Sequence, residues 1–393
     1  MMIDLFRQAL QSASPVSAVE ALLEEHPELP AATGQAWSDG FFCDHVPAQI
    51  AALLVRHGAP LSVHAAAGFG FTGELAAMLD ADPALVHAKG GDGCTPLHFA
   101  RDLATAQLLI ARGAHMDARD DDHDSTPAQW RIGKAPEVAR YLLECGATPD
   151  IFLAAALGDA ALTTSLIAAN PACPAHRIGR SPDFPPIGHQ GRGGTILQWT
   201  LAFNSYPHQV ALLKGHQHIF DLLYHHSDVR TRLLVNCVLG RRPEAEAIAT
   251  AHPELIPNLD SSDLELPALY CWETNTNLEA VRLMLDLGFP VAHLESNHGY
   301  SPLHNAAWSG NAALVDLLLS RGHPVDLVDP RYNSTALGYA IHDCVTEKRH
   351  PEGEFAHVVR SLLRAGSTWT PGMFPCGDAK VDAVFHEFQR ERA

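Results

Sequence analysis

The chain has 393 residues, of which 47% are hydrophobic and 18% are charged. It carries 27 Lys and Arg against 45 Asp and Glu, a formal net charge of -18 at pH 7. Such an acidic surface repels phosphate groups, so the composition argues against nucleic acid and anionic membranes as partners. Asp4 and Arg7 interrupt the first ten residues, which predicts a helix rather than a signal peptide. The sequence has no run of about 18 apolar residues, so it predicts no membrane-spanning helix.

Apolar residues recur at helical spacing along nearly the whole chain and divide it into short helix pairs. The pair at Ser301 shows the pattern best, because Ser301 can cap the first helix and Pro302 fits its first turn. Gly310 and Gly322 then end the two helices. We predict about eleven such pairs. In chain order the pairs begin at Ile3, Trp37, Val63, Thr95, Thr126, Ile151, Tyr206, Arg232, Leu266, Ser301 and Ser334, and Lys380–Arg390 is a closing helix.

The second pair is predicted as Trp37–Asp44 with Pro47–Arg56. A larger departure follows at 173–205, where prolines and glycines are dense from Pro174 to Gly194 and predict a long loop. After this loop, every second residue is apolar, which is the period of a strand: Leu197, Trp199, Leu201 and Phe203. We therefore predict an inserted β-hairpin or long loop, which could be functional or could only shield the core.

The helix pairs share a sequence motif as well as their spacing. Thr95-Pro-Leu-His98 and Ser301-Pro-Leu-His304 open two of them, and Thr126-Pro-Ala-Gln129 is a weaker copy. Leu303 and Leu337 lie 34 residues apart. This start, the closing Gly and the spacing resemble the ankyrin repeat.

The resemblance implies an all-α ankyrin-repeat solenoid. Residues 1–172 would hold the N-terminal repeats with a capping pair, and 173–205 would be the inserted hairpin or loop. Residues 206–370 would hold the C-terminal repeats with an insertion at about 343–355, and 371–393 would form a C-terminal cap helix. In such repeats, histidines such as His98 and His304 bond between neighbouring turns.

Cysteine and histidine usage indicates neither disulfides nor a metal. The eight cysteines form no Cys-x-x-Cys pair, which favours reduced thiols and a cytoplasmic location. Among the 24 histidines, the cluster His216, His218, His225 and His226 spans a turn and both ends of a helix, so it does not fit one zinc site. Gly68-Phe-Gly-Phe-Thr-Gly73 fits a dinucleotide pattern but follows a helix rather than a strand. We therefore predict no metal and no cofactor.

The resemblance also indicates which side chains face the concave groove, namely the residue after Thr-Pro-Leu-His and the two after Ala-Ala. Trp199 of the insertion joins them, and in the copy near Tyr270 the register leaves Trp272 and Glu273 as alternatives. Aromatic side chains there would give a large contact area at low entropic cost, although each could instead pack on its neighbour. The matched positions hold Phe99, Trp130, Tyr270, Asn305, Trp308, Tyr339, His342 and Asp343.

Two functions follow from this reading. The first is a non-catalytic protein that binds a protein or peptide on its concave groove. The alternative is a small-molecule-binding protein or enzyme, with an aromatic pocket walled by the 173–205 and 343–355 insertions. A deep pocket lined by Trp199, Trp308 and His342 would favour this alternative. Its acid–base residues would be Glu273, His342, Asp343 and His189.

Overall fold

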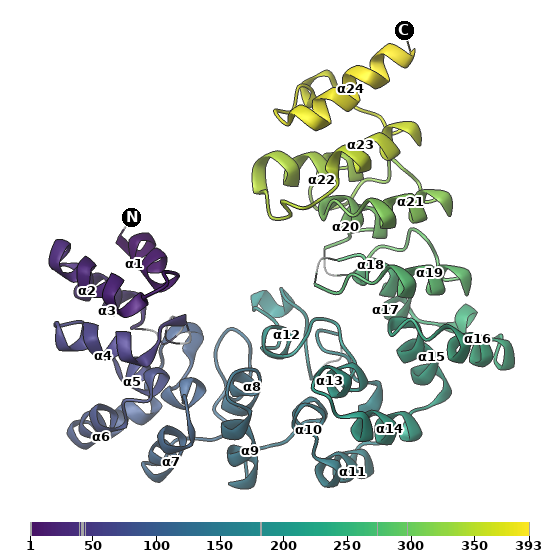
Figure 1. Cartoon of the computed structure of the whole chain (residues 1–393). Helices are drawn as coiled ribbons and strands as arrows, with labels where there is room; N and C mark the ends of the chain where they lie inside the picture. Colours follow the sequence, from purple (N-terminus) through teal and green to yellow (C-terminus); the bar gives the residue numbers. More distant parts are fainter. Residues whose placement is uncertain are drawn as a thin grey trace. The chain divides into compact units, whose positions relative to one another are not determined.

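A computed structural model describes residues 2–38, 40, 43, 45–180, 183–272, 274–296 and 298–392. Contacts divide the chain into two compact units, residues 1–173 with 177–220 and residues 174–176 with 221–393. In both units the regular elements of the described residues are helices, which confirms the predicted all-α class (Figure 1).

The first unit contains the α-helices α1 (Met2–Leu10), α2 (Pro15–Glu25), α3 (Leu29–Ala36), α4 (Ala48–Arg56), α5 (Val63–Phe69), α6 (Thr72–Ala81), α7 (Leu103–Ala111), α8 (Pro127–Arg131), α9 (Pro136–Glu144), α10 (Ile151–Leu157), α11 (Ala160–Ala169), α12 (Leu197–Thr200) and α13 (Pro207–Leu213). Short 3-10 turns lie at Pro83–His87, Gly91–Gly93, Pro96–Phe99, Cys173–Ala175 and His189–Gly191. The boundary between the units falls within α14 (Gln217–His226).

The second unit contains α15 (Val229–Val238), α16 (Arg242–Ala251), α17 (Ser261–Leu264), α18 (Leu266–Leu269), α19 (Leu278–Asp286), α20 (Pro302–Trp308), α21 (Ala312–Ser320), α22 (Ala336–His342), α23 (Phe355–Arg364) and α24 (Ala379–Arg392). A π-helical turn, Asp343–Glu347, follows α22. Further 3-10 turns lie at Ile256–Asn258 and Pro371–Met373.

Successive helices pair as predicted. Counting the 3-10 turn Pro96–Phe99 as the partner of α7, the described residues contain eleven pairs. They are α1–α2, α3–α4, α5–α6, this turn with α7, α8–α9, α10–α11, α13–α14, α15–α16, α18–α19, α20–α21 and α22–α23.

The histidines of the repeat starts cap one helix and bond to the next turn. The Nδ1 atom of His304 accepts a hydrogen bond from the backbone N–H of Ser301 at 3.2 Å, while its Nε2 lies 3.1 Å from the carbonyl oxygen of Ser334. His98 makes the same contacts to Thr95 and Ser125. These bonds confirm the predicted structural role of both histidines, because each ties one repeat to its successor.

Small and branched apolar residues fill the space between the pairs. In α20, Leu303 is 1% exposed, and Ala306 and Ala307 are fully buried. Because alanine lacks a long side chain, α20 can lie close to its neighbours α18 and α22. All eight cysteines are free thiols. Among the described residues, none of the helices combines the length and the apolarity needed to cross a bilayer.

The predicted strand in the 173–205 insertion is wrong. Thr195–Phe203 contains the short helix α12 instead, and the described residues include no strand. The alternating apolar residues do not share a buried face, because Leu197 is fully buried whereas Trp199 is 60% exposed. Local hydrogen bonds form a helical turn here, because the N–H groups of Trp199 and Thr200 both donate to the carbonyl oxygen of Ile196. The long loop before α12 is present as predicted.

A helix that was not predicted, α3 (Leu29–Ala36), precedes α4 in the second pair. Of the segment that was predicted, Trp37–Asp44, residues 39, 41, 42 and 44 lie outside the described residues. Leu29 in α3, Trp37 directly after it, and Cys43 and Val46 further along all belong to one buried cluster.

Candidate functional site

The second unit contains a pocket of about 640 Å³. It lies beside α20 and α22 and beside the loops that precede these two helices. This volume lies within the range of small-ligand sites and is sufficient for one large side chain of a partner. Its aromatic lining consists of Trp272, Tyr300, Trp308, Tyr332, Tyr339 and His342.

The two helices contribute a packed floor of rings. Trp308 ends α20, and Tyr339 and His342 lie one turn apart on α22. The Trp308 ring stacks on His342, with centroids 5.9 Å apart, and meets Tyr339 edge to face at 6.0 Å. The indole Nε1 of Trp308 is buried and has no hydrogen-bond partner among the described residues. A bound carbonyl group would satisfy this donor.

A buried carboxylate holds the loop that carries Tyr332. Asp329 is fully buried and accepts hydrogen bonds from the backbone N–H groups of Arg331, Tyr332 and Ser334 at 2.7 to 2.9 Å. Burial alone would raise the pKa of Asp329, but these bonds lower it overall and keep the carboxylate charged. The loop is therefore rigid at its base, whereas the Tyr332 side chain itself is 61% exposed at the pocket.

A second acidic residue holds the turn that ends at Tyr300. The Glu295 side chain accepts from the backbone N–H of Tyr300 at 3.3 Å and from that of His298 at 2.6 Å. The Tyr300 ring stacks on His298 at 5.2 Å and lies parallel to Trp272 at 6.4 Å. Burial raises the pKa of Tyr300 to about 12, so its hydroxyl stays protonated at neutral pH.

The insertion between α22 and α23 supplies the charged rim. The Asp343 carboxylate is fully buried, and its Oδ2 lies 3.1 Å from Nδ1 of His350. This contact closes the insertion, and the pocket gains Glu347 and Arg349 from it. Glu347 lies 3.7 Å from Nε2 of His342 and 3.3 Å from Nε of Arg349.

The return of the insertion depends on a close backbone approach. The N–H of Glu354 donates to the carbonyl oxygen of Gly310 at 2.9 Å. A Cβ atom at Gly310 would lie 2.6 Å from Cα of Gly353, and Gly310 has a φ of +65°. Only glycine combines this conformation with this contact. The turn between α20 and α21 therefore anchors the insertion that walls the pocket.

The structure brings together four of the predicted site residues: Trp272, Trp308, Tyr339 and His342. The other predicted ligand-binding residues are not among those that line this pocket. Tyr270 and Asn305 are 3% exposed and lie in the core of the second unit, where Nδ2 of Asn305 donates to the Ala268 carbonyl oxygen. Phe99, Trp130 and Trp199 belong to the first unit. There Trp130 donates to Asp120 and Trp199 packs on Phe203.

Of the residues of the catalytic alternative that the structure describes, His342 is the one in the pocket lining. His342 lines the pocket, but Asp343 points its buried carboxylate at His350. His189 belongs to the first unit, and Glu273 lies outside the described residues. The neighbouring thiol of Cys344 is no ready nucleophile, since burial raises its pKa to about 11.

Sequence reasoning missed Tyr300, Tyr332, Glu347 and Arg349, all of which line the pocket. A signal for the tyrosines was present. Tyr300 directly precedes Ser301, and Tyr332 precedes the next repeat start by a few residues. The structure places both in turns that flank the inner helices of the repeats. The insertion at 343–355 was expected to wall a pocket, but its residues Glu347 and Arg349 could not be singled out, because an insertion has no repeat register to place them.

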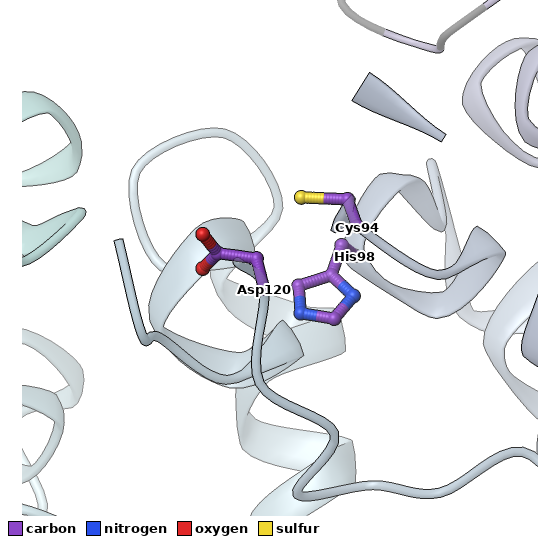
Figure 2. A group of neighbouring side chains, drawn as sticks. All are labelled: Cys94, His98 and Asp120. Carbon is purple, nitrogen blue, oxygen red and sulfur yellow. The ribbon is translucent and has the colours of Figure 1, made fainter. Parts of the chain in front are cut away.

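A different group, in the first unit, has the composition of a metal site (Figure 2). Ligand atoms of Cys94, His98 and Asp120 lie within 4.8 Å of one another, and all three residues are buried. Repeat structure already explains two of them. His98 uses both ring nitrogens as described above, and the Asp120 carboxylate accepts from three backbone N–H groups and from the Trp130 indole. An ion would have to break these bonds, so this group is structural.

Known families match two stretches of the chain. Residues 92–121 match the model for "Ankyrin repeat", and residues 273–319 match that for "Ankyrin repeats (many copies)". With the succession of helix pairs, these matches identify the chain as an ankyrin repeat protein. Ankyrin repeats generally mediate protein–protein interactions.

The ankyrin repeat domain of human ASB11 is a similar solved structure. It is 18% identical, with 78% of this chain and 99% of that chain covered and a TM-score of 0.28. None of the curated proteins matches this chain.

Proposed function

We propose that the protein binds a partner protein by taking up a positively charged side chain of that partner in the aromatic pocket of the second unit. The observation that carries this proposal is the convergence of Trp272, Tyr300, Trp308, Tyr332 and Tyr339 on one pocket. Ring faces attract cations, and this attraction strengthens when the cation is partly removed from water.

A negatively charged side chain at the pocket rim and the negative charge of the whole chain favour a basic partner. Glu347 provides a carboxylate at the rim, and the whole chain has a formal net charge of -18. Arg349 already pairs with Glu347, but its side chain is 60% exposed, so this pair contributes little to stability and can exchange with an incoming lysine or arginine. Long-range attraction would also speed the encounter with a basic segment at low salt.

The pocket also offers a contact for the partner's main chain. Trp308 lines the pocket, and its buried indole N–H has no hydrogen-bond partner among the described residues. A peptide carbonyl that reaches it would form a hydrogen bond that the unbound protein lacks, and this would favour a peptide over a bare cation.

A peptide array probed with the full chain tests the proposal. Otherwise identical peptides carry Lys, Arg, Leu or Glu at a central position. We expect the Lys and Arg peptides to bind better than the Leu and Glu peptides. Trp308→Ala should weaken them by more than about tenfold, the loss typical of a binding hot spot. Glu347→Gln should weaken the basic peptides alone.

Trp199→Ala is the matched control, because it removes an exposed tryptophan that is not part of this pocket. It should leave binding unchanged. Circular dichroism establishes that each variant is folded. If folded Trp308→Ala protein binds the basic peptides as well as the wild type does, or if Leu peptides bind as well as Lys peptides, the proposal is wrong.

A further inference from the structure

Side chains from two successive repeat turns of the first unit lie close together beside the 173–205 insertion. Oδ2 of Asp92 lies 3.7 Å from Nε2 of His123, and Oδ2 of Asp122 lies 3.6 Å from the same nitrogen. All three ligand atoms lie within 4.8 Å of one another. Asp92 comes from the turn before the repeat at Thr95, and the other two from the turn before the repeat at Thr126.

The backbone fixes this juxtaposition. The carbonyl oxygen of Asp92 accepts from the N–H groups of Asp121 and Asp122 at 2.7 and 3.3 Å, so the two turns are joined. The Asp120 carboxylate accepts from the N–H groups of Asp122 and His123 and holds the second turn closed. The three side chains therefore meet on backbone that is itself well bonded.

The insertion determines which nitrogen of His123 is available. Its Nδ1 lies 2.8 Å from the carbonyl oxygen of Gly194, which can only accept, so Nδ1 carries the proton. Nε2 is then the ring nitrogen that faces the two carboxylates, and the side chain is only 9% exposed. A histidine that ligates a metal commonly has its other nitrogen bonded to a backbone carbonyl in this way.

Asp122 is oriented by the same segment. Its Oδ1 accepts from the N–H of Gly193 at 3.0 Å, which leaves Oδ2 toward His123. A Cβ atom at Gly193 would lie 2.5 Å from Oδ2 of Asp122 and 2.7 Å from Cε1 of His123. A side chain at position 193 would therefore displace Asp122 or His123 from this arrangement.

The two distances from Nε2 of His123 are longer than those of a hydrogen-bonded ion pair. A charged hydrogen bond from an imidazolium to a carboxylate would measure about 2.7–2.9 Å, which is shorter than either separation here. Zinc bonds of about 2.0–2.1 Å in a tetrahedral arrangement place neighbouring ligand atoms about 3.3 Å apart. The observed 3.6 and 3.7 Å need to shrink by only a few tenths of an ångström to reach this spacing.

The other acidic groups nearby have partners of their own. Lys89 pairs with Asp121, and Arg119 and Arg192 pair with Asp124. We propose that Asp92, Asp122 and His123 bind one divalent cation of the zinc type, with water completing its coordination. The bound ion links two repeats, and through Gly193 and Gly194 it fastens the insertion to them.

Titration of the full chain with Zn²⁺ alone, in competition with a chromophoric chelator, tests the proposal. We expect one zinc per chain, and we expect Asp122→Asn and His123→Ala each to weaken it at least about tenfold. His225→Ala is the control for adventitious binding, because His225 and His226 form an exposed pair on α14. It should leave the affinity of the tight site unchanged.

Thermal unfolding provides a second readout that does not depend on the buried histidine. Asp92→Asn keeps the size of the side chain and one of its oxygens at an exposed position, so this variant should fold. Zinc should raise the melting temperature of the wild type but not of Asp92→Asn. The proposal is overturned if folded wild-type protein binds no zinc. It is also overturned if the Asp92→Asn, Asp122→Asn and His123→Ala variants bind and respond to zinc as the wild type does.

Discussion

Acid should weaken the repeat array through its buried histidines, and His98 allows the sharpest test. Burial lowers the pKa of His98 to about 4, although the hydrogen bond to the Ser125 carbonyl oxygen opposes this shift. In the unfolded chain the pKa of histidine is about 6.5. Between these two pKa values the histidine binds a proton in the unfolded state but not in the folded state, so the free energy of unfolding decreases as pH falls.

The magnitude follows from the two pKa values. Above about pH 6.5 the full stability is present, and below about pH 4 the loss is complete at about 3 kcal/mol. Between about pH 7 and about pH 5, His98 alone should cost about 2 kcal/mol. Other groups titrate over the same interval, so the effect of His98 has to be isolated by comparison with a variant.

The chain itself indicates the variant. At the same position of the next repeat, Oε1 of Gln129 accepts from the backbone N–H of Thr126 at 2.9 Å, as Nδ1 of His98 does from Thr95. His98→Gln should therefore keep the cap and remove the titration. Urea unfolding followed by circular dichroism at the two pH values should show a loss about 2 kcal/mol smaller in the variant than in the wild type. Equal losses in both proteins would refute the assignment of His98 as a neutral buried group.

Three further predictions concern the repeats. Leu303→Ala should lower the free energy of unfolding by roughly 2–5 kcal/mol. Hydrogen exchange should accelerate in α20 and its neighbours more than in α5. Uniform acceleration would argue against repeats that couple only to their neighbours. Asp120→Ala should cost at least about 2 kcal/mol in urea unfolding, because it removes the acceptor for four N–H groups; a neutral substitution would contradict that role. A thiol reagent at about pH 8 should label the exposed Cys145 well before Cys237, whose pKa burial raises to about 12. Equal labelling rates would mean that Cys237 is not buried.

The repeat architecture was predictable because the same sequence motif occurs several times along the chain. Ser301, Pro302 and His304 encode a cap and a cross-repeat hydrogen bond locally, and each copy supports the same interpretation. The insertion 173–205 has no second copy. Its alternating residues matched a strand, whereas local hydrogen bonds to Ile196 form a helix there, and bonds to the distant residues Ser125 and Gln129 hold that helix in place.

The candidate site was predictable in part for the same reason. Trp308, Tyr339 and His342 follow from the repeat register, since each has a fixed place on an inner helix. Phe99 shares that register but is only 4% exposed, because its ring packs against His64 and Trp130. Register gives the direction of a side chain, whereas exposure depends on what the neighbouring repeat places against it.

The measurement that bears most directly on the pocket is the indole N–H spectrum of the protein with and without a bound basic peptide. The chain has six tryptophans, so single Trp→Phe variants suffice to assign the signals. Binding in the pocket should shift the signals of Trp272 and Trp308 and should move that of Trp308 furthest, because its free N–H gains an acceptor. Shifts confined to Trp130 or Trp199, with Trp272 and Trp308 unmoved, would place the partner elsewhere and contradict the account.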